Sequence, residues 1–275
     1  MRLTTKIIIG IILSILLISM AFIASLSFSD KKNFKRSSSY NVELSQNNIT
    51  GIELSSFNTI VIDEVPYESE EYKYYISNDC HVYFDSITEK DDPDMMFIPE
   101  SFKDFVLTDF HGDTLKIKLD KHGIGNKYKS EEHRHHSILG LNISFRVSKI
   151  DIINNVQNLS VNVSNIETDS IKIISYDDII IKSCKAQYIA PILKTNHKKL
   201  EITNSEAKRV NLDIDDIRNW NIENCNIEEQ YITGSRKHHI TQHRKESGII
   251  NWIPKNNNAE LNINVKGDTT QIIFP

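Results

Sequence analysis

A short apolar pattern recurs five times in the second half of the sequence, and it constrains the fold more than any other feature. Each copy holds two apolar residues separated by one residue and, after two further positions, two inward-facing residues that are again separated by one residue. Alternation with a period of two is typical of β-strands, and the short runs between the copies alternate in the same way. Each copy therefore predicts about two strands. The copies are Phe145/Val147/Ile150/Ile152, Val161/Val163/Ile166/Thr168, Ile179/Ile181/Cys184/Ala186, Leu200/Ile202/Ser205/Ala207 and Trp220/Ile222/Cys225/Ile227.

Recurrence of strand pairs without helices predicts a solenoid, because one such coil cannot bury its apolar side alone. Stacked coils place parallel strands about 4.8 Å apart, with equivalent residues above one another. The expected fold is therefore all-β, a parallel β-helix-like solenoid with coils of about 20 residues. An ordinary β-sandwich whose strands happen to be evenly spaced is the alternative.

The sixth position of the pattern forms a predicted ladder along the stack. Its members are Ile150, Ile166, Cys184, Ser205 and Cys225, and the residues before them are Lys149, Asn165, Ser183, Asn204 and Asn224. Asn at such a corner suits the left-handed backbone of a tight turn. Because Ser205 separates them, Cys184 and Cys225 would lie roughly 9.6 Å apart, beyond the ~7 Å Cα limit of a disulfide. With Cys80, the three cysteines are too few for a disulfide framework, and we expect free, buried thiols.

The chain begins with a long uncharged apolar run, residues 7–29. At ~1.5 Å per residue this run is long enough to cross a ~30 Å hydrocarbon core as a helix, and Arg2 and Lys6 precede it. We expect one N-terminal transmembrane helix that acts as an uncleaved anchor. Cleavage near Ala24 or Ser27 is the alternative.

The expected localisation is the bacterial cell membrane, single-pass, with the C-terminal domain in the periplasm or outside. Four basic residues after the apolar run oppose this orientation and would favour a cytoplasmic domain. They are Lys31, Lys32, Lys35 and Arg36.

The predicted domain organisation has three parts. Residues 1–29 are the anchor or signal segment, 30–50 a polar tether, and 51–275 the β-solenoid domain. Within that domain, 51–137 is an irregular first part, and 138–275 holds the regular coils and a C-terminal cap. The first part contains alternating runs such as "HVYFD" (81–85) and two strands around a turn at His111–Asp113. No helical period appears in the charged loop 121–137.

The strand runs "LSSFNTIVID", "HGDTLKIKLD" and "NSEAKRVNLDI" resemble those of the head GIN domain family, a group described as autotransporter-type adhesins of bacterial envelopes. The resemblance covers residues 50–275. It implies an exported β-helix-like domain, and it carries no functional residues.

Composition and motifs exclude several classes of protein. The net charge of −5 is unlike the basic surface of a nucleic-acid-binding protein. No phosphate-binding loop, nucleophile elbow or HExxH motif is present. We therefore predict a protein that is not an enzyme, with no catalytic, cofactor-binding or metal-binding residues.

Two histidine groups are the candidates for a metal site. One lies in the loop 121–137 and the other in "KHHITQHR". Imidazole clusters bind zinc, copper or nickel, and His133 and His135 would share a face of an extended chain. The neighbouring Lys and Arg residues would repel a cation, so solvated loops are the preferred interpretation. The residues are His133, His135 and His136, and His238, His239 and His243.

Carboxylates and aromatic residues are the remaining candidates. The carboxylates could coordinate calcium or act on a polysaccharide, although a solvated face or corner is favoured for them. The aromatic residues could stack on sugar rings or a protein partner, with core packing favoured for Trp220. The carboxylates are Asp177, Asp178, Asp213, Asp215 and Asp216, and the aromatic residues are Tyr67, Tyr72, Tyr74, Tyr75, Trp220 and Trp252.

These features favour a membrane-anchored, envelope-exposed β-solenoid that acts as a non-catalytic binding, adhesive or scaffolding module. The expected partners are the membrane, through residues 7–29, and a glycan or an envelope protein as ligand. Two alternatives are left open. One is a polysaccharide-processing enzyme on a β-helix scaffold, and the other is a cytoplasm-facing membrane scaffold.

Overall fold

A computed structural model describes residues 40–43, 47–66, 73–87, 92–128, 135–196, 198–238, 243–244, 247–262, 265–266 and 271–273. Most of these residues lie in strands that form two large sheets, so the all-β prediction is confirmed. The described helices are a 3-10 helix, η1 (Glu100–Phe105), and a short α-helix, α2 (Lys121–Tyr128).

The strands fall into an N-terminal group, a repeated group and a C-terminal group. The N-terminal strands are β1 (Tyr40–Glu43), β2 (Ile49–Leu54), β3 (Thr59–Glu64), β4 (Lys73–Ile76), β5 (His81–Ser86), β6 (Asp94–Pro99), β7 (Val106–His111), β8 (Thr114–Leu119), β9 (His135–Leu139), β10 (Asn142–Val147) and β11 (Ile152–Asn155). The repeated strands are β12 (Ser160–Ser164), β13 (Glu167–Ser175), β14 (Ile179–Lys182), β15 (Lys185–Leu193), β16 (Lys198–Thr203), β17 (Glu206–Asp213), β18 (Ile217–Glu223) and β19 (Asn226–Gly234). The C-terminal strands are β20 (Lys237–His238), β21 (His243–Arg244), β22 (Ser247–Pro254), β23 (Glu260–Leu261), β24 (Val265–Lys266) and β25 (Gln271–Ile273).

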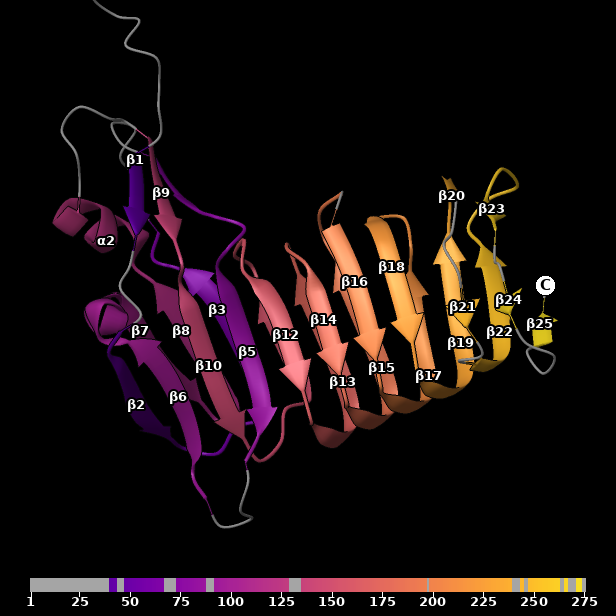
Figure 1. Ribbon diagram of the computed structural model, residues 1–275, viewed down its shortest axis with the longest axis horizontal. Coiled ribbons are helices and arrows are strands. Elements are labelled where there is room, and N and C mark those ends of the chain that lie inside the picture. Colours follow the sequence, from indigo (N-terminus) through magenta and orange to yellow (C-terminus); the bar gives the residue numbers. More distant parts are fainter. Residues whose placement is uncertain are drawn as a thin grey trace, which may run out of the picture.

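Two sheets face each other and enclose the core. The eight-stranded sheet has the order β18-β16-β14-β12-β5-β10-β6-β2, and the ten-stranded sheet has the order β25-β22-β19-β17-β15-β13-β11-β3-β8-β7. Figure 1 shows the strands stacking along the long axis, with the C-terminal strands at the right. Buried side chains from both sheets form a single hydrophobic cluster along this axis.

From β12 to β19 the chain alternates between the two sheets, and we call each successive pair of strands, one per sheet, a coil. Every strand of a coil pairs in parallel with its equivalent in the next coil. The pairing follows the register that the repeat predicts: Val161, Ile179, Leu200 and Trp220 align, as do Thr168, Ala186, Ala207 and Ile227. Like residues therefore stack on like.

One corner of each coil adopts the left-handed backbone predicted for it. The non-glycine residues with positive φ are Asn165, Ser183, Asn204 and Asn224, at 51° to 56°. The backbone N–H groups of the first three each donate to a carbonyl of the next coil, those of Lys182, Thr203 and Glu223, over 2.9–3.0 Å. These hydrogen bonds continue the strand pairing around the corner.

The first predicted copy of the repeat does not stack as expected. Strand β5 lies between β10 and β12 and pairs in parallel with both, so that Phe84 is opposite Phe145 on one side and Val163 on the other. Phe145 therefore aligns with Val163, two positions away from the predicted match. Ile152, predicted to face inward, is 36% exposed, whereas Ile153 is buried. Lys149 does not share the positive φ of the later corners.

The N-terminal part also departs from the predicted organisation in two further places. Residues 121–128, expected to lack helical structure, form α2, because the Asp120 carboxylate caps it by accepting from the Gly123 N–H over 2.7 Å. Residues 40–43, expected to belong to a polar tether, form β1, which pairs in parallel with β9. The predicted turn at His111–Asp113 does join two antiparallel strands, β7 and β8.

The predicted single-pass membrane localisation is wrong for the chain that the structure describes. Among the described residues, no helix has both the length and the apolar character that a membrane span requires. The longer of the two, α2, has 8 residues, whereas a span needs about 20. The expected anchor at residues 7–29 lies outside the described residues.

Candidate binding face

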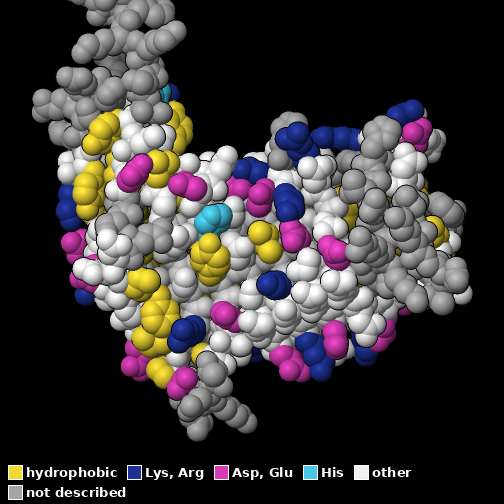
Figure 2. Space-filling view, viewed as in Figure 1, with side chains coloured by type: hydrophobic (Ala, Val, Ile, Leu, Met, Phe, Trp, Pro, Cys, Tyr) yellow, Lys and Arg dark blue, Asp and Glu magenta, His cyan; other side chains and the backbone are white. Residues whose placement is uncertain are grey.

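The outer face of the eight-stranded sheet changes character along the stack. Toward β18 the outward-facing residues are polar, as at Glu201 and Asn221. Toward β2 they include Ile49, 66% exposed, and Tyr83, 38% exposed, with Phe97 partly exposed. Figure 2 looks onto this face and shows hydrophobic side chains gathered over the N-terminal strands at the left. Apolar groups exposed together in this way mark a candidate contact surface.

A pocket of about 230 Å³ lies within this apolar region. It spans β2, β6, β10 and β5, because β10 pairs with β5 on one side and β6 on the other, and β6 pairs with β2. The pairing places Phe97, Ser144 and Tyr83 side by side in one row across the sheet. The lining residues are Ile49, Tyr83, Phe97, Ile98, Pro99, Asn142 and Ser144. We call this cavity the sheet pocket.

Polar atoms without partners surround Tyr83. The Oδ1 atom of Asn142, which lines the sheet pocket, is buried and makes no hydrogen bond within the protein. The same holds for Nδ1 of His81, whose ring centre lies 5.7 Å from that of Tyr83, and for Nδ2 of Asn162, which is opposite Tyr83 on β12. Buried polar atoms are normally paired, so these three amide and imidazole groups have unused capacity to bind a ligand.

Two charged or titratable groups set the electrostatics of this region. Burial raises the pKa of the Tyr83 phenol, so the hydroxyl stays neutral and able to donate at physiological pH. The Arg146 guanidinium lies 5.2 Å from the centre of the Phe97 ring, which is a cation–π contact. The sheet pocket itself is lined by uncharged residues in the described chain.

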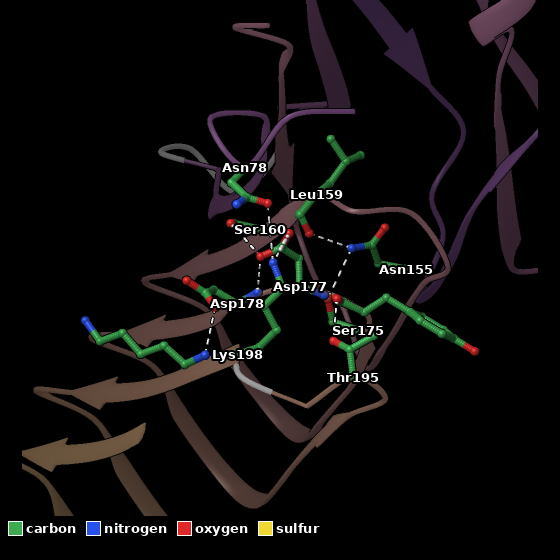
Figure 3. Close-up of polar contacts among 11 residues, drawn as sticks. Asn78, Asn155, Leu159, Ser160, Ser175, Asp177, Asp178, Thr195 and Lys198 are labelled. Atoms are coloured by element: carbon green, nitrogen blue, oxygen red, sulfur yellow. Dashed lines mark hydrogen bonds and ion pairs between the residues drawn. The ribbon is translucent and has the colours of Figure 1, made fainter. Parts of the chain in front are cut away.

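Asp177, for which a solvated face or corner was predicted, is buried in a hydrogen-bonded network (Figure 3). Its carboxylate contacts Lys198 Nζ at 2.8 Å and accepts from the Asp178 N–H at 2.6 Å and the Ser160 hydroxyl at 3.4 Å. Lys198 Nζ also donates to Asn78 Oδ1 at 3.5 Å. A carboxylate that is held by a lysine and closed off from solvent is suited to fixing a corner, since it has no access to a substrate.

A second network involves Asp213 and Asp215. Lys255 Nζ lies 2.7 Å from Asp213 and 2.8 Å from Asp215. Burial opposes ionisation of Asp215, but hydrogen bonds from Lys255 and the Ser235 N–H outweigh it and lower its pKa to about 2. The pKa of Lys255 is raised, because the two carboxylates outweigh the effect of burial. Both groups are therefore charged at neutral pH, which suits an ion pair and not proton transfer.

The structure describes the side chains of two of the six candidate histidines, His135 and His136. His136 is buried, with its ring centre 5.7 Å from Tyr40 and 5.2 Å from Tyr74, and His135 stacks on Tyr75 at 6.0 Å. His133 and His239 lie outside the described residues, and the side chains of His238 and His243 are not described either. In the part of the chain that the structure covers, no group of three or more metal-binding side chains comes together.

The other predicted aromatic residues also take different places. Trp220 and Trp252 are buried in the core, as favoured for Trp220. Tyr75 is 47% exposed and Tyr74 is half-buried on β4, away from the sheet pocket. Tyr67 and Tyr72 lie outside the described residues.

All three cysteines are buried and free, as predicted. The Cys184 thiol donates to the Lys182 carbonyl at 3.4 Å, and the Ser205 hydroxyl makes the equivalent bond to the Thr203 carbonyl at 2.9 Å. Cys225 repeats this contact with the Glu223 carbonyl at 3.3 Å. At these three coils the ladder position holds a small side chain with one donor, and Cys and Ser both make the contact.

The residues of the sheet pocket were not among the sequence candidates. One signal was available: in "HVYFD" the alternation places His81, Tyr83 and Asp85 on the face opposite buried Val82 and Phe84. An exposed tyrosine flanked by a histidine and a carboxylate was therefore predictable. Its proximity to Ile49, Phe97 and Asn142 was not, because that depends on the strand order.

The chain was compared with known families, curated proteins and solved structures. No protein-family model matches the chain, and no curated protein matches it either. A "putative adhesin" from Parabacteroides distasonis is similar over 84% of this chain and 99% of its own, with 11% identity and a TM-score of 0.51. A "putative adhesin" from Bacteroides fragilis is similar over 85% of this chain and 100% of its own, with 13% identity and a TM-score of 0.47. The first likeness shows a shared fold, and at these identities it shows nothing further.

Proposed function

We propose that the chain is a non-catalytic, adhesin-like binding module and that the outer face of its eight-stranded sheet, around the sheet pocket, contacts the ligand. One observation carries this proposal. Apolar and aromatic side chains, Ile49, Tyr83 and Phe97, are exposed around a pocket at the N-terminal end of the eight-stranded sheet. Single exposed apolar residues are ordinary, but a group of them beside a pocket with unpaired polar atoms is typical of a binding site.

The proposal extends to the fold and the family. Parallel coils with stacked equivalent residues support a β-solenoid architecture for residues 51–275, with an irregular first part and regular coils after it. Such solenoids present long rigid surfaces that recognise partners without chemistry. The resemblance to head GIN domain proteins and the fold shared with an adhesin-like protein from Parabacteroides distasonis agree with this assignment.

The alternative of a polysaccharide-processing enzyme receives no support from the described carboxylates. Asp177 is paired with Lys198, and Asp213 and Asp215 are paired with Lys255. An acid–base pair for glycoside cleavage needs two carboxyl groups that face one open site and differ in protonation. In the described networks Asp177 is instead paired with its own lysine, and Asp213 and Asp215 share Lys255.

A binding assay on defined surfaces tests the proposal. The full chain is applied to an array of glycans, glycoproteins and unglycosylated proteins, together with the double variant Tyr83→Ser/Phe97→Ser. The matched control is Ile174→Ser/Ile192→Ser, which makes the same kind of change at two partly exposed, adjacent positions of the ten-stranded sheet. We expect binding to some array members, lost in the first variant and kept in the control. Binding that survives the first variant would contradict the proposed face.

A further inference from the structure

We propose that the sheet pocket binds one neutral pyranose ring of a glycan, with the ring stacked on Tyr83. This inference rests on the proposed binding function of the same face and adds the chemical class of the ligand. Three features of the pocket support it: its size, the combination of apolar and polar groups around it, and the uncharged side chains of its described lining.

The pocket is sized for a single small ring. Its volume of about 230 Å³ lies below the ~300–1,000 Å³ of sites that enclose a drug-sized molecule. It is open on the outer face of a sheet, so a longer ligand can continue across the surface on either side of the bound ring. A terminal or internal sugar of a glycan has this shape, whereas a folded protein partner would contact the broad face and not fill the cavity.

The lining joins an apolar surface to groups that bind hydroxyls. Tyr83 and Phe97 lie on either side of Ser144 in one row of the sheet and present aromatic surface to the apolar C–H face of a sugar. Asn142 Oδ1 is buried in the pocket without a partner. Outside the lining but next to Tyr83, His81 on the same strand and Asn162 on β12 each hold another unpaired nitrogen. A hydroxyl both donates and accepts, so amides and an imidazole together match a ring that carries several hydroxyls.

The charge of the pocket favours a neutral ligand. Its described lining is made of aliphatic, aromatic, amide and hydroxyl side chains. The nearest acidic group on the strand of Tyr83 is Asp85, whose carboxylate accepts from the Asn165 side chain at 2.9 Å. Arg146 is engaged with the Phe97 ring. The lining itself holds no cation, so an acidic sugar or a phosphate group would bury its charge without a partner in the lining, which is unfavourable.

Saturation-transfer difference NMR with the full chain tests the inference. The probes are neutral methyl glycosides of glucose, galactose, mannose and N-acetylglucosamine, with glucuronate, octanoate and a tyrosine-rich peptide as comparators. We expect saturation of the ring protons of at least one neutral glycoside. The signal should fall roughly tenfold in Tyr83→Ala, because the stacking surface is removed, and change little in Tyr83→Phe. Asn142→Leu should weaken it several-fold, whereas Asn221→Leu, at the other end of the same face, should leave it unchanged.

The substitutions are chosen so that folding does not obscure the result. Tyr83→Phe and Asn142→Leu nearly conserve volume, and circular dichroism of each variant should match that of the parent chain. Signals from octanoate or the peptide in place of the glycosides would overturn the inference, as would glycoside signals that persist in Tyr83→Ala.

Periodate oxidation of the arrayed glycans separates failure of this inference from failure of the proposed function. If oxidation abolishes the binding that depends on Tyr83 and Phe97, both stand. If binding still depends on these residues but is unaffected by oxidation, the face binds a ligand of another class and the sugar inference falls alone. If binding does not depend on these residues at all, both fall.

Discussion

The coils from β12 to β19 and the strands before them share one hydrophobic core, yet their strands are ordered by different rules. In the coils, each strand pairs with the strand one repeat further along the chain. In the N-terminal part, strands pair out of sequence order, and β5 lies between β10 and β12. In the regular region the outward-facing residues of the eight-stranded sheet include Glu201 and Asn221, whereas the irregular region exposes the sheet pocket. Local repetition thus orders the coils, and its interruption forms the proposed binding face.

The junction between the two regions is the most direct place to test whether they unfold together. Phe84 lies between them, fully buried, and stacks on Phe145 at 4.9 Å. We expect Phe84→Ala to lower the free energy of unfolding by about 3–5 kcal/mol, because it opens a cavity at this contact. Urea unfolding followed by the fluorescence of Trp220 and Trp252, both in the C-terminal half, should show the full loss.

The control for this junction is Phe84→Leu, a smaller change in shape that should cost clearly less. If the tryptophan transition keeps its midpoint in Phe84→Ala, the coils are stable without the N-terminal strands, and the shared core does not couple the two regions.

A polar contact also joins the regions, through Lys198 and Asn78. In Asp177→Ala, the Lys198 ammonium, the Asp178 N–H and the Ser160 hydroxyl lose their acceptor. We expect a loss of about 1.5–3 kcal/mol in thermal or urea unfolding, as for hydrogen bonds to a charged group. Asp169→Ala, at an exposed position, should change the stability by less than about 0.5 kcal/mol. Equal effects of the two substitutions would argue against the network.

The backbone at the corners differs between the regular and the irregular region, at Asn204 and Lys149 respectively. Asn204 has φ of 51°, a region that costs a residue with an ordinary side chain about 1–2 kcal/mol. We therefore expect Asn204→Ala to destabilise by about that amount and Asn204→Gly to restore most of it. Lys149 occupies the equivalent predicted position without the positive φ, so Lys149→Ala should change the stability by at most about 0.5 kcal/mol. Similar losses of stability in Asn204→Ala and Lys149→Ala would show that the positive φ of Asn204 does not cause the destabilisation.

The buried thiols are alike in the two regions, and their effect on stability depends on pH. Burial raises the pKa of Cys80 and of Cys184 from 9.0 to about 11. The unfolded chain therefore releases these protons first, so the stabilising contribution is complete below pH 9 and is lost as the pH rises toward 11. Urea midpoints measured between pH 8 and pH 11 should fall over this range.

Cys184→Ser separates the thiol contribution from other groups that titrate at high pH. Serine already fills this ladder position at Ser205 and donates to the equivalent carbonyl. The variant should fold with nearly unchanged stability at pH 8 and lose less stability above pH 9 than the parent chain. An unchanged alkaline profile would assign the loss to residues other than Cys184.

The coils were predictable because the signals that specify each coil are local in its sequence. Alternation predicts which side chains are buried, and Asn before the sixth position predicts the left-handed corner. Strand order in the N-terminal part has no such local signal: the insertion of β5 between β10 and β12 shifts Phe145 by two positions from the match that the repeat suggests. Helix α2 follows from the cap at Asp120 and not from any apolar period. Prediction of the sheet pocket is limited by strand order in the same way. The alternation of "HVYFD" predicts that Tyr83 is exposed, but it cannot predict that Phe97 lies near it.

The alignment of equivalent residues from coil to coil has a consequence for the evolution of the molecule's length. A coil such as β14 with β15 meets its two neighbours through nearly the same apolar contacts, so it behaves as a cassette. Duplicating or deleting one cassette would change the reach of the stack by about 4.8 Å while leaving the sheet pocket and both ends intact. Variation of coil number is therefore a route by which a chain of this design can adjust spacing independently of specificity.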